Sequence, residues 1–100
     1  MKLRHKFNAK RQEVDGINFD SKMEARYYQK LKDDEGTLFF LRQVPIHLPG
    51  TVYRVDFLEF KKDGSVLFTD VKGMETSLFK IKKKMVEQLY PITINVVKKV

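Results

Sequence analysis

The chain of 100 residues contains no cysteine and only two histidines, His5 and His47. The lack of cysteine excludes a disulfide scaffold, a thiol nucleophile and a cysteine-based zinc site. Two histidines, one near the start of the chain and one beside two prolines, are too few for an imidazole-rich metal centre. Any metal ion in this protein must therefore be held by oxygen atoms.

Long apolar runs are also missing. No window approaches the roughly 18 consecutive apolar residues that a membrane-spanning helix requires. Residues 1–11 are basic, but no apolar stretch follows them as it would in a secretory signal. The chain length suits one domain and is too short for separate cofactor and substrate domains. We therefore expect a single-domain cytoplasmic protein with no membrane partner.

Charge of one sign is in excess. Lysine and arginine number 20 against 13 acidic residues, a formal net charge of +7, which favours a polyanionic partner such as DNA. Hydrophobic residues make up 42% of the chain, enough for a packed core. Five bases and no acid fall in residues 1–11, so we expect a flexible basic arm over residues 1–12 and one domain over residues 13–100. The basic residues of the arm are Lys2, Arg4, Lys6, Lys10 and Arg11.

Hydrophobic periodicity predicts an α/β chain of the mixed α+β type. The predicted elements are a short extended segment over 14–19, a helix over 21–31, strands over 39–46, 52–60 and 65–72, a helix over 77–90 and a strand over 92–97. Pro91 stops the second helix. Apart from the short segment, the order is αβββαβ, and we expect a central mixed sheet flanked by helices.

The second and third predicted strands form a hairpin whose register can be deduced. Residues 62–64 end in Gly64, which suits the left-handed position of a three-residue loop. Lys61 then faces Ser65, and the same register places Asp56 directly opposite Asp70. The two carboxylates share one face of the hairpin because directly opposite residues project to the same side.

Like charges directly opposite each other destabilise a sheet, so this pair needs a reason. One is that the acids form ion pairs with Arg54 or with Lys72, which lies on the same face as Asp70. The other is a divalent cation. The apolar residues that flank both acids predict a covered hairpin, in which unpaired carboxylates are costly, and this favours the cation.

Glu24 is a third candidate acid. Ser21 and Glu24 have the spacing of a capping box, in which the glutamate bonds the backbone N–H of the serine. Tyr27, Tyr28 and Leu31 follow Glu24 at helical spacing, so the glutamate projects from the face that meets the core. Glu24 is therefore either a cap or a ligand, and together with Asp56 and Asp70 we favour the ligand.

The second helix has an apolar stripe that we expect to be buried. The stripe consists of Leu78, Ile81, Met85 and Leu89. Lys82 falls inside the apolar sector, where its ammonium can extend outward to solvent or reach a phosphate. The other lysines of this helix, Lys80, Lys83 and Lys84, lie on the opposite face.

These features resemble the PD-(D/E)XK nuclease superfamily. The resemblance lies in Asp56, then 13 intervening residues, then Asp70-Val71-Lys72, after a helix with an inward Glu24. The order αβββαβ is similar to the restriction-endonuclease-like core. More specifically, FDSKMEA over residues 19–25, VDF over 55–57 and DVKG over 70–73 resemble small phage and prophage proteins described as uncharacterised or as endonucleases. One departure is Val55, where the superfamily often has proline.

The resemblance implies a magnesium-dependent endodeoxyribonuclease that hydrolyses phosphodiester bonds. The implied ligands of Mg²⁺, which Mn²⁺ can replace, are Glu24, Asp56, Asp70 and the backbone carbonyl of Val71. Lys72 is the implied motif lysine, which positions the attacking water or stabilises the phosphorane. A phage-encoded protein of this kind would act in the host cytoplasm.

DNA is the expected partner, contacted through phosphates by basic residues away from the carboxylates. These are Lys2, Arg4, Lys6, Lys10 and Arg11 of the arm, with Lys80, Lys82, Lys83 and Lys84 of the second helix. A domain this small has little surface for reading base sequence, which favours DNA structure, such as a four-way junction, as the target. Symmetric cleavage of two strands would require a homodimer. The alternative is a nucleic-acid-binding protein that has the nuclease fold but does not cut.

Overall fold

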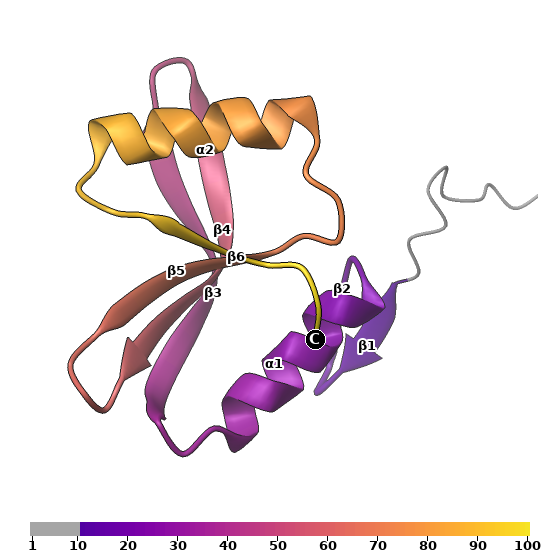
Figure 1. Ribbon diagram of the computed structural model, residues 1–100. Helices are drawn as coiled ribbons and strands as arrows, with labels where there is room; N and C mark the ends of the chain where they lie inside the picture. Colours follow the sequence, from indigo (N-terminus) through magenta and orange to yellow (C-terminus); the bar gives the residue numbers. More distant parts are fainter. Residues whose placement is uncertain (1–10) are drawn as a thin grey trace, which may run out of the picture.

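The computed structural model describes residues 11–100, which form two helices, a small hairpin and a four-stranded sheet (Figure 1). The elements are β1 (Gln12–Val14), β2 (Ile17–Phe19), α1 (Lys22–Asp33), β3 (Thr37–Leu48), β4 (Thr51–Lys61), β5 (Val66–Val71), α2 (Ser77–Leu89) and β6 (Ile94–Val97). The sheet order is β3-β4-β5-β6, with β5 and β6 parallel and the other neighbours antiparallel. The protein is thus a single α+β domain with a mixed sheet, and the predicted order αβββαβ is confirmed.

The segment before α1 is more regular than the sequence predicts. Strands β1 and β2 pair as a hairpin, and Asp15 and Gly16 at its turn have φ values of 54° and 75°. Two successive positive φ values are typical of the tight turns that close two-residue hairpins. Gln12, which we assigned to the basic arm, already belongs to β1. The rest of the predicted arm, up to residue 10, lies outside the described residues.

Helix α1 begins as its sequence predicts. Ser21 is the N-cap, and its hydroxyl accepts a hydrogen bond from the backbone N–H of Glu24 at 3.1 Å. Ala25, Tyr28 and Leu31 are among the buried residues of the face toward the sheet. Asp34 ends the helix, since its backbone is extended.

The hairpin of β4 and β5 has the predicted register. The residue numbers of each observed pair, for example Phe57 with Thr69, sum to 126, as the sequence indicated. Lys61 donates its N–H to Ser65 at 2.9 Å, and Gly64 has the left-handed φ of 91°. The loop geometry therefore sets the alignment of the strands that carry Asp56 and Asp70.

Helix α2 buries a different face from the one predicted. Leu78, Ile81 and Leu89 are exposed, by 62%, 58% and 54%, while Phe79 and Val86 are buried. The apolar residues of α2 occupy two adjacent sectors, and the sector with the aromatic ring fills the core. Of the expected stripe, only Met85 packs against the core. Among residues 11–100, neither helix is long and apolar enough to cross a membrane.

Two hydrophobic clusters share the long β3–β4 hairpin. One cluster forms around α1 and includes Phe57, and the other forms under α2 and includes Val55. Figure 1 shows α2 near the β3–β4 turn and α1 near the other end of the hairpin. Asp56 lies between Phe57 and Val55, at the junction of the two clusters.

Candidate active site

Asp56 and Asp70 lie where strands β4 and β5 separate. The backbone pairing of these strands ends at Phe57 and Thr69. Beyond that pair, the N–H of Asp56 donates to Asp70 Oδ1 and the N–H of Val71 donates to Asp56 Oδ2, both at 2.9 Å. Each carboxylate thus replaces a backbone carbonyl of the opposite strand. The predicted juxtaposition of the two aspartates is confirmed.

Both aspartates are buried, with 7% of Asp56 and 1% of Asp70 exposed. The second oxygen of Asp70, Oδ2, is buried and has no hydrogen-bond partner among the described residues. An unpartnered buried carboxylate oxygen is costly and calls for a ligand or a proton. The aspartate pair is therefore incompletely satisfied by the protein itself.

Glu24 reaches this region from the first turn of α1, where it is buried. Its backbone N–H bonds the cap residue Ser21, but its carboxylate bonds elsewhere, so only half of the capping box forms. Glu24 Oε2 accepts a hydrogen bond from Gln43 Nε2 at 3.3 Å and lies 3.5 Å from Nη2 of Arg42. The side chain therefore faces the sheet, as the ligand hypothesis requires.

Gln43, which was not among the predicted site residues, connects the glutamate to the aspartates. Its amide Nε2 also donates to Asp56 Oδ1 at 3.2 Å, so one amide group bridges Glu24 and Asp56. The backbone of Gln43 has a φ of 52°, which is uncommon for a residue other than glycine. Such local strain persists only where surrounding contacts hold it, and it is frequent at functional sites.

Arg42, the neighbour of Gln43, is a second site residue that was not predicted from the sequence. Its guanidinium lies 4.4 Å from the ring centroid of Phe19 and pairs with Glu24. Two successive polar residues, Arg42 and Gln43, interrupt the apolar strand β3. This interruption was the sequence feature that could have indicated a polar site here. The partners of these residues could not be predicted from the sequence, because β2, α1 and β4 supply them.

The surroundings of the three carboxylates disfavour their charged forms. Burial, followed by the charge of Asp56, raises the pKa of Glu24 to about 7. Burial also raises the pKa of Asp56 and of Asp70, against the lowering effect of their backbone hydrogen bonds. Clefts in which burial and like charges raise carboxyl pKa values are typical of functional sites.

Lys72, the lysine of the motif, forms no ion pair with a described residue. Its backbone N–H donates to Val97 and its ammonium lies 5.5 Å from the ring centroid of Phe79. After the larger effects of burial and hydrogen bonding, its charge lowers the pKa of Asp56 and Asp70. The half-buried ammonium therefore stands beside the carboxylates without neutralising them.

The donor set suits a hard divalent cation, because carboxylate oxygens are the preferred ligands of Mg²⁺. As they stand, no three acidic or histidine side chains within residues 11–100 are grouped closely enough to hold an ion. The contacts instead run from Glu24 through Gln43 to Asp56, and from Asp56 to Asp70. Val71 enters this chain through its N–H. A cation would have to displace the Gln43 amide to join Glu24 to Asp56.

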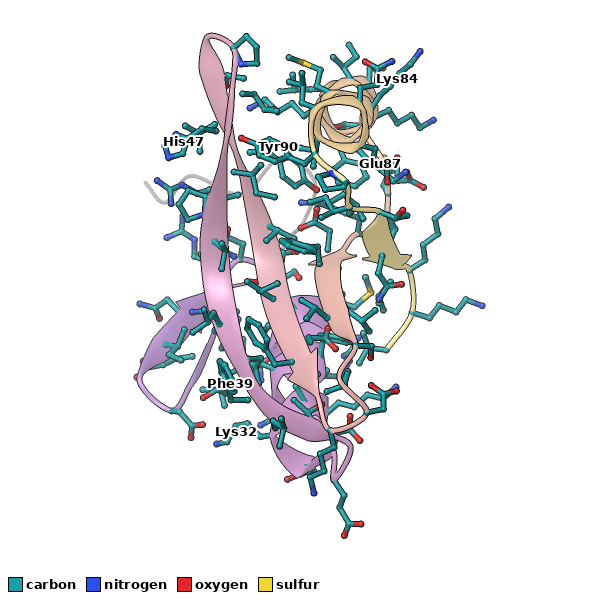
Figure 2. The ribbon with its side chains drawn as sticks, turned by 90° about the vertical axis from the view of Figure 1, so that its left-hand side faces the viewer. Lys32, Phe39, His47, Lys84, Glu87 and Tyr90 are labelled. Atoms are coloured by element: carbon teal, nitrogen blue, oxygen red, sulfur yellow. The ribbon has the colours of Figure 1, made fainter. Side chains whose placement is uncertain are left out.

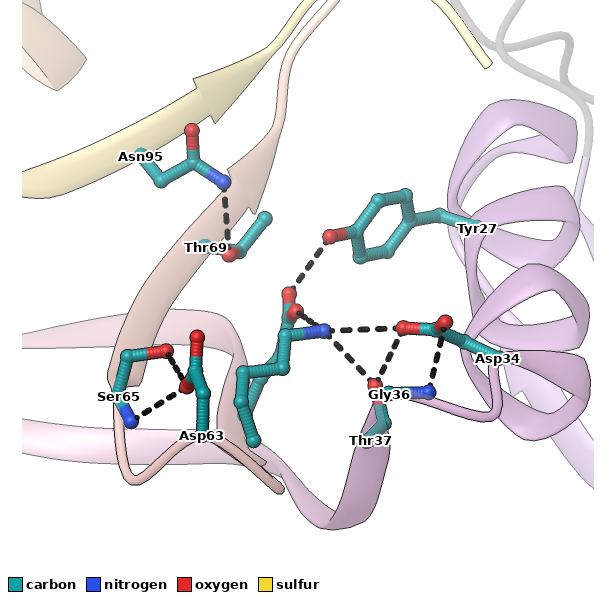
Figure 3. Close-up of polar contacts among 10 residues, drawn as sticks. Tyr27, Asp34, Gly36, Thr37, Asp63, Ser65, Thr69 and Asn95 are labelled. Atoms are coloured by element: carbon teal, nitrogen blue, oxygen red, sulfur yellow. Dashed lines mark hydrogen bonds and ion pairs between the residues drawn. The ribbon is translucent and has the colours of Figure 1, made fainter.

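A second buried acid on β4 provides a contrast (Figure 3). Glu59 is completely buried, and its Oε2 accepts a 2.6 Å hydrogen bond from the hydroxyl of Tyr27. Lys61 Nζ lies 2.9 Å from Oε1, an ion pair rather than a well-aligned hydrogen bond, and also contacts Asp34 and Thr37. Burial alone would lower the pKa of Lys61, but Glu59 and then Asp34 raise it. This acid is neutralised within the fold.

The basic residues predicted to contact DNA differ in their surroundings. Arg11, Lys80 and Lys84 are exposed. Lys82 donates to the carbonyl of Val52 at 3.4 Å, and Lys83 pairs with a glutamate one turn along α2, so both have partners within the domain. The predicted arm residues Lys2, Arg4, Lys6 and Lys10 lie outside the described residues.

The fold and the site define a small α+β domain with buried carboxylates at the junction of two cores. The chain belongs to the family described as protein of unknown function (DUF1064), whose sequence profile matches residues 4–40 and 40–99. No curated protein matches the chain significantly. No solved structure matches it significantly either.

Proposed function

We propose that this protein is a metal-dependent DNA endonuclease of the PD-(D/E)XK type. The observation that carries the proposal is the linked set of buried carboxylates, Glu24, Asp56 and Asp70, whose pKa values are all raised. Among the described residues only Glu24 has an ion-pair partner, Arg42. Three acids from α1, β4 and β5 at one junction are costly for a purely structural role. The motif order and the predicted element order support the same assignment.

In this proposal the three carboxylates and the carbonyl of Val71 hold Mg²⁺, with Mn²⁺ as a substitute. The buried Oδ2 of Asp70, which lacks a partner among the described residues, is an oxygen available to such an ion. When bound, the ion supplies activation of a water molecule and charge neutralisation at the scissile phosphate. The raised carboxyl pKa values fit this role, because a cation favours the charged form that burial disfavours.

Lys72 orients the attacking water or stabilises the developing charge on the phosphate oxygens. Its ammonium is close enough to lower the pKa of Asp56 and Asp70, yet it is not consumed by an ion pair with a described residue. Exposed bases such as Arg11, Lys80 and Lys84 contact phosphates farther along the DNA. Binding through such contacts weakens steeply with salt.

The target is DNA structure, such as a branch or a four-way junction, because a domain of this size offers little surface for base recognition. Such a protein, phage-encoded as the sequence resemblance implies, would act in the host cytoplasm. The family membership leaves the substrate open, so the test must include more than one form of DNA.

The decisive experiment is cleavage of supercoiled plasmid and of a synthetic four-way junction in Mg²⁺ or Mn²⁺. We expect Asp70→Ala and Lys72→Ala to lower the rate at least about 100-fold, as loss of a metal ligand or a preorganised charge does. The matched controls are Glu35→Ala and Lys62→Ala, which remove exposed charges of the same sign outside the site. Equal cleavage by wild type and all four variants, or none by wild type on any substrate, would contradict the proposal.

The rival function is DNA binding without cleavage. It is favoured by the Gln43 bridge and the backbone hydrogen bonds of the aspartates, which give the carboxylates partners within the fold. Calorimetric titration with Mn²⁺ separates the two functions. Binding that Asp56→Ala abolishes supports the enzyme, whereas salt-sensitive DNA binding with no metal affinity supports the rival.

A further inference from the structure

The face of the sheet opposite α1 is apolar, and among residues 11–100 only its edge at Phe68, which packs against the cluster under α2, is covered. Six side chains, here called the outer sheet patch, project away from α1. They form two rows across β3, β4 and β5, because the register pairs Leu41 with Leu58 and Leu58 with Phe68, and likewise Phe39 with Phe60 and Phe60 with Val66. The alternate residues Phe40 and Phe57 pack in the α1 cluster on the other side.

Three of the six patch residues are exposed and the other three are half-buried. Figure 2 shows this face toward the viewer, with α1 behind the sheet and α2 beside its upper part. Phe39, Leu41 and Val66 are 52%, 48% and 45% exposed, and the rings of Phe39 and Phe60 stack with centroids 4.4 Å apart. Contiguous exposed apolar surface of this kind marks an interaction site.

The charge pattern indicates which partner fits. None of the six positions is charged, whereas a nucleic-acid platform needs cations among its aromatic rings. Another exposed apolar surface, the stripe of Leu78, Ile81 and Leu89 on α2, runs between lysines that would repel those of a second copy. A second copy of this basic chain can therefore approach the outer sheet patch without bringing side-chain charges together.

The area limits the strength of such an association. With 150–250 Å² for a large apolar side chain, the exposed fractions give on the order of 350 Å² per copy. Two copies with some polar rim then bury about 1,000 Å², the range of weak and transient complexes. Two flat sheet faces can pack about 10 Å apart with their side chains interdigitated.

We propose that the outer sheet patch is a homodimer interface in which two copies pack their sheets face to face. Because interfaces of this size are typically weak and transient, the dissociation constant should be micromolar or weaker. Asp56 and Asp70 follow the patch along β4 and β5, so the dimer would hold two carboxylate sites in one particle. The interface does not depend on the proposed nuclease activity.

Sedimentation equilibrium of the full chain between about 5 and 500 µM tests this interface. We expect a monomer–dimer equilibrium that Leu41→Ser and Phe39→Ser each weaken at least tenfold. Leu78→Ser, which removes an equally exposed leucine from α2, should leave it unchanged. Circular dichroism checks that the variants fold, and urea unfolding that their stability is similar.

Thiol labelling gives a second measurement, because the chain has no cysteine of its own. In Leu41→Cys the introduced thiol should react more slowly as protein concentration rises, while in Leu78→Cys the rate should stay constant. A wild-type monomer at every concentration would overturn the proposal. So would a dimer that only the α2 variants disrupt, or patch variants that lose DNA binding while the wild type stays monomeric.

Discussion

Strand β4 carries two buried acids only three residues apart, Asp56 and Glu59. They differ in whether a cation pairs with them. Glu59 accepts a hydrogen bond from Tyr27, and its charge is matched by Lys61 of the same strand. Asp56 lies beside another aspartate and is linked through a neutral amide to Glu24. Glu59 therefore belongs to a network in which a lysine balances its charge. Asp56 belongs to a group with more carboxylates than cations.

The difference teaches how to separate structure from function among buried acids. A buried ion pair contributes little net stability, but it leaves no unbalanced charge. An acid cluster with fewer cations than carboxylates raises the energy of the fold, and such a cost is typical of sites that bind a ligand or act on a substrate. Variants that remove the cation beside Glu59, or neutralise one of the acids, test this difference.

The largest effect is expected from Lys61→Met. The substitution leaves Glu59 fully buried with no cation, and losing one partner of a buried pair costs about 3–5 kcal/mol. Lys72→Met is the matched control, because Lys72 forms no ion pair with a described residue, and it should cost less than about 1 kcal/mol. Urea unfolding at pH 8 in EDTA measures both. Equal losses would show that the two clusters do not differ in this way.

The register of the acidic hairpin could be predicted because it depends on local chemistry. A glycine in the left-handed position of a three-residue loop sets the alignment of both strands, and Asp56 and Asp70 follow from it. The helix glutamate could be placed for the same reason, since the cap at Ser21 fixes where α1 begins.

The roles of Arg42 and Gln43 could not be predicted, because they depend on contacts between distant elements. Gln43 adopts a backbone conformation that its residue type disfavours, and its partners lie 13 and 19 residues away. The face of α2 was predicted wrongly for a related reason. Periodicity shows that Leu78 and Phe79 begin two adjacent apolar sectors, but the shape of the core decides which one is buried.

The pH dependence of stability should reveal the raised pKa of Glu24. Its pKa is about 7 in the folded state against the ordinary 4.5, so between these values the folded protein binds more protons than the unfolded chain. The free energy of unfolding therefore falls as pH rises from about 4.5 to 7, by about 3 kcal/mol for this group. Unfolding of metal-free wild type should show this fall, and its difference from Glu24→Gln isolates the contribution.

Added Mg²⁺ sharpens the same measurement. If the carboxylates hold the ion, stability should be regained above pH 7 in wild type, because an ion that binds only the folded state stabilises it. Glu24→Gln should regain less. A flat pH profile in wild type, or the same profile in both proteins, would show that the pKa of Glu24 is not raised.

The smallest change in stability is expected from two isosteric variants that neutralise an acid. Here the sign of the change carries the information. Asp70→Asn keeps an oxygen that can accept the N–H of Asp56 and removes a charge that burial disfavours, so metal-free stability at pH 8 should rise. Glu59→Gln removes the charge that Lys61 balances and should lower stability by about 1–2 kcal/mol. The two shifts in urea midpoint are therefore expected to have opposite signs. Shifts in the same direction would contradict the distinction between Glu59, whose charge a lysine balances, and Asp70, whose charge no ion pair balances among the described residues.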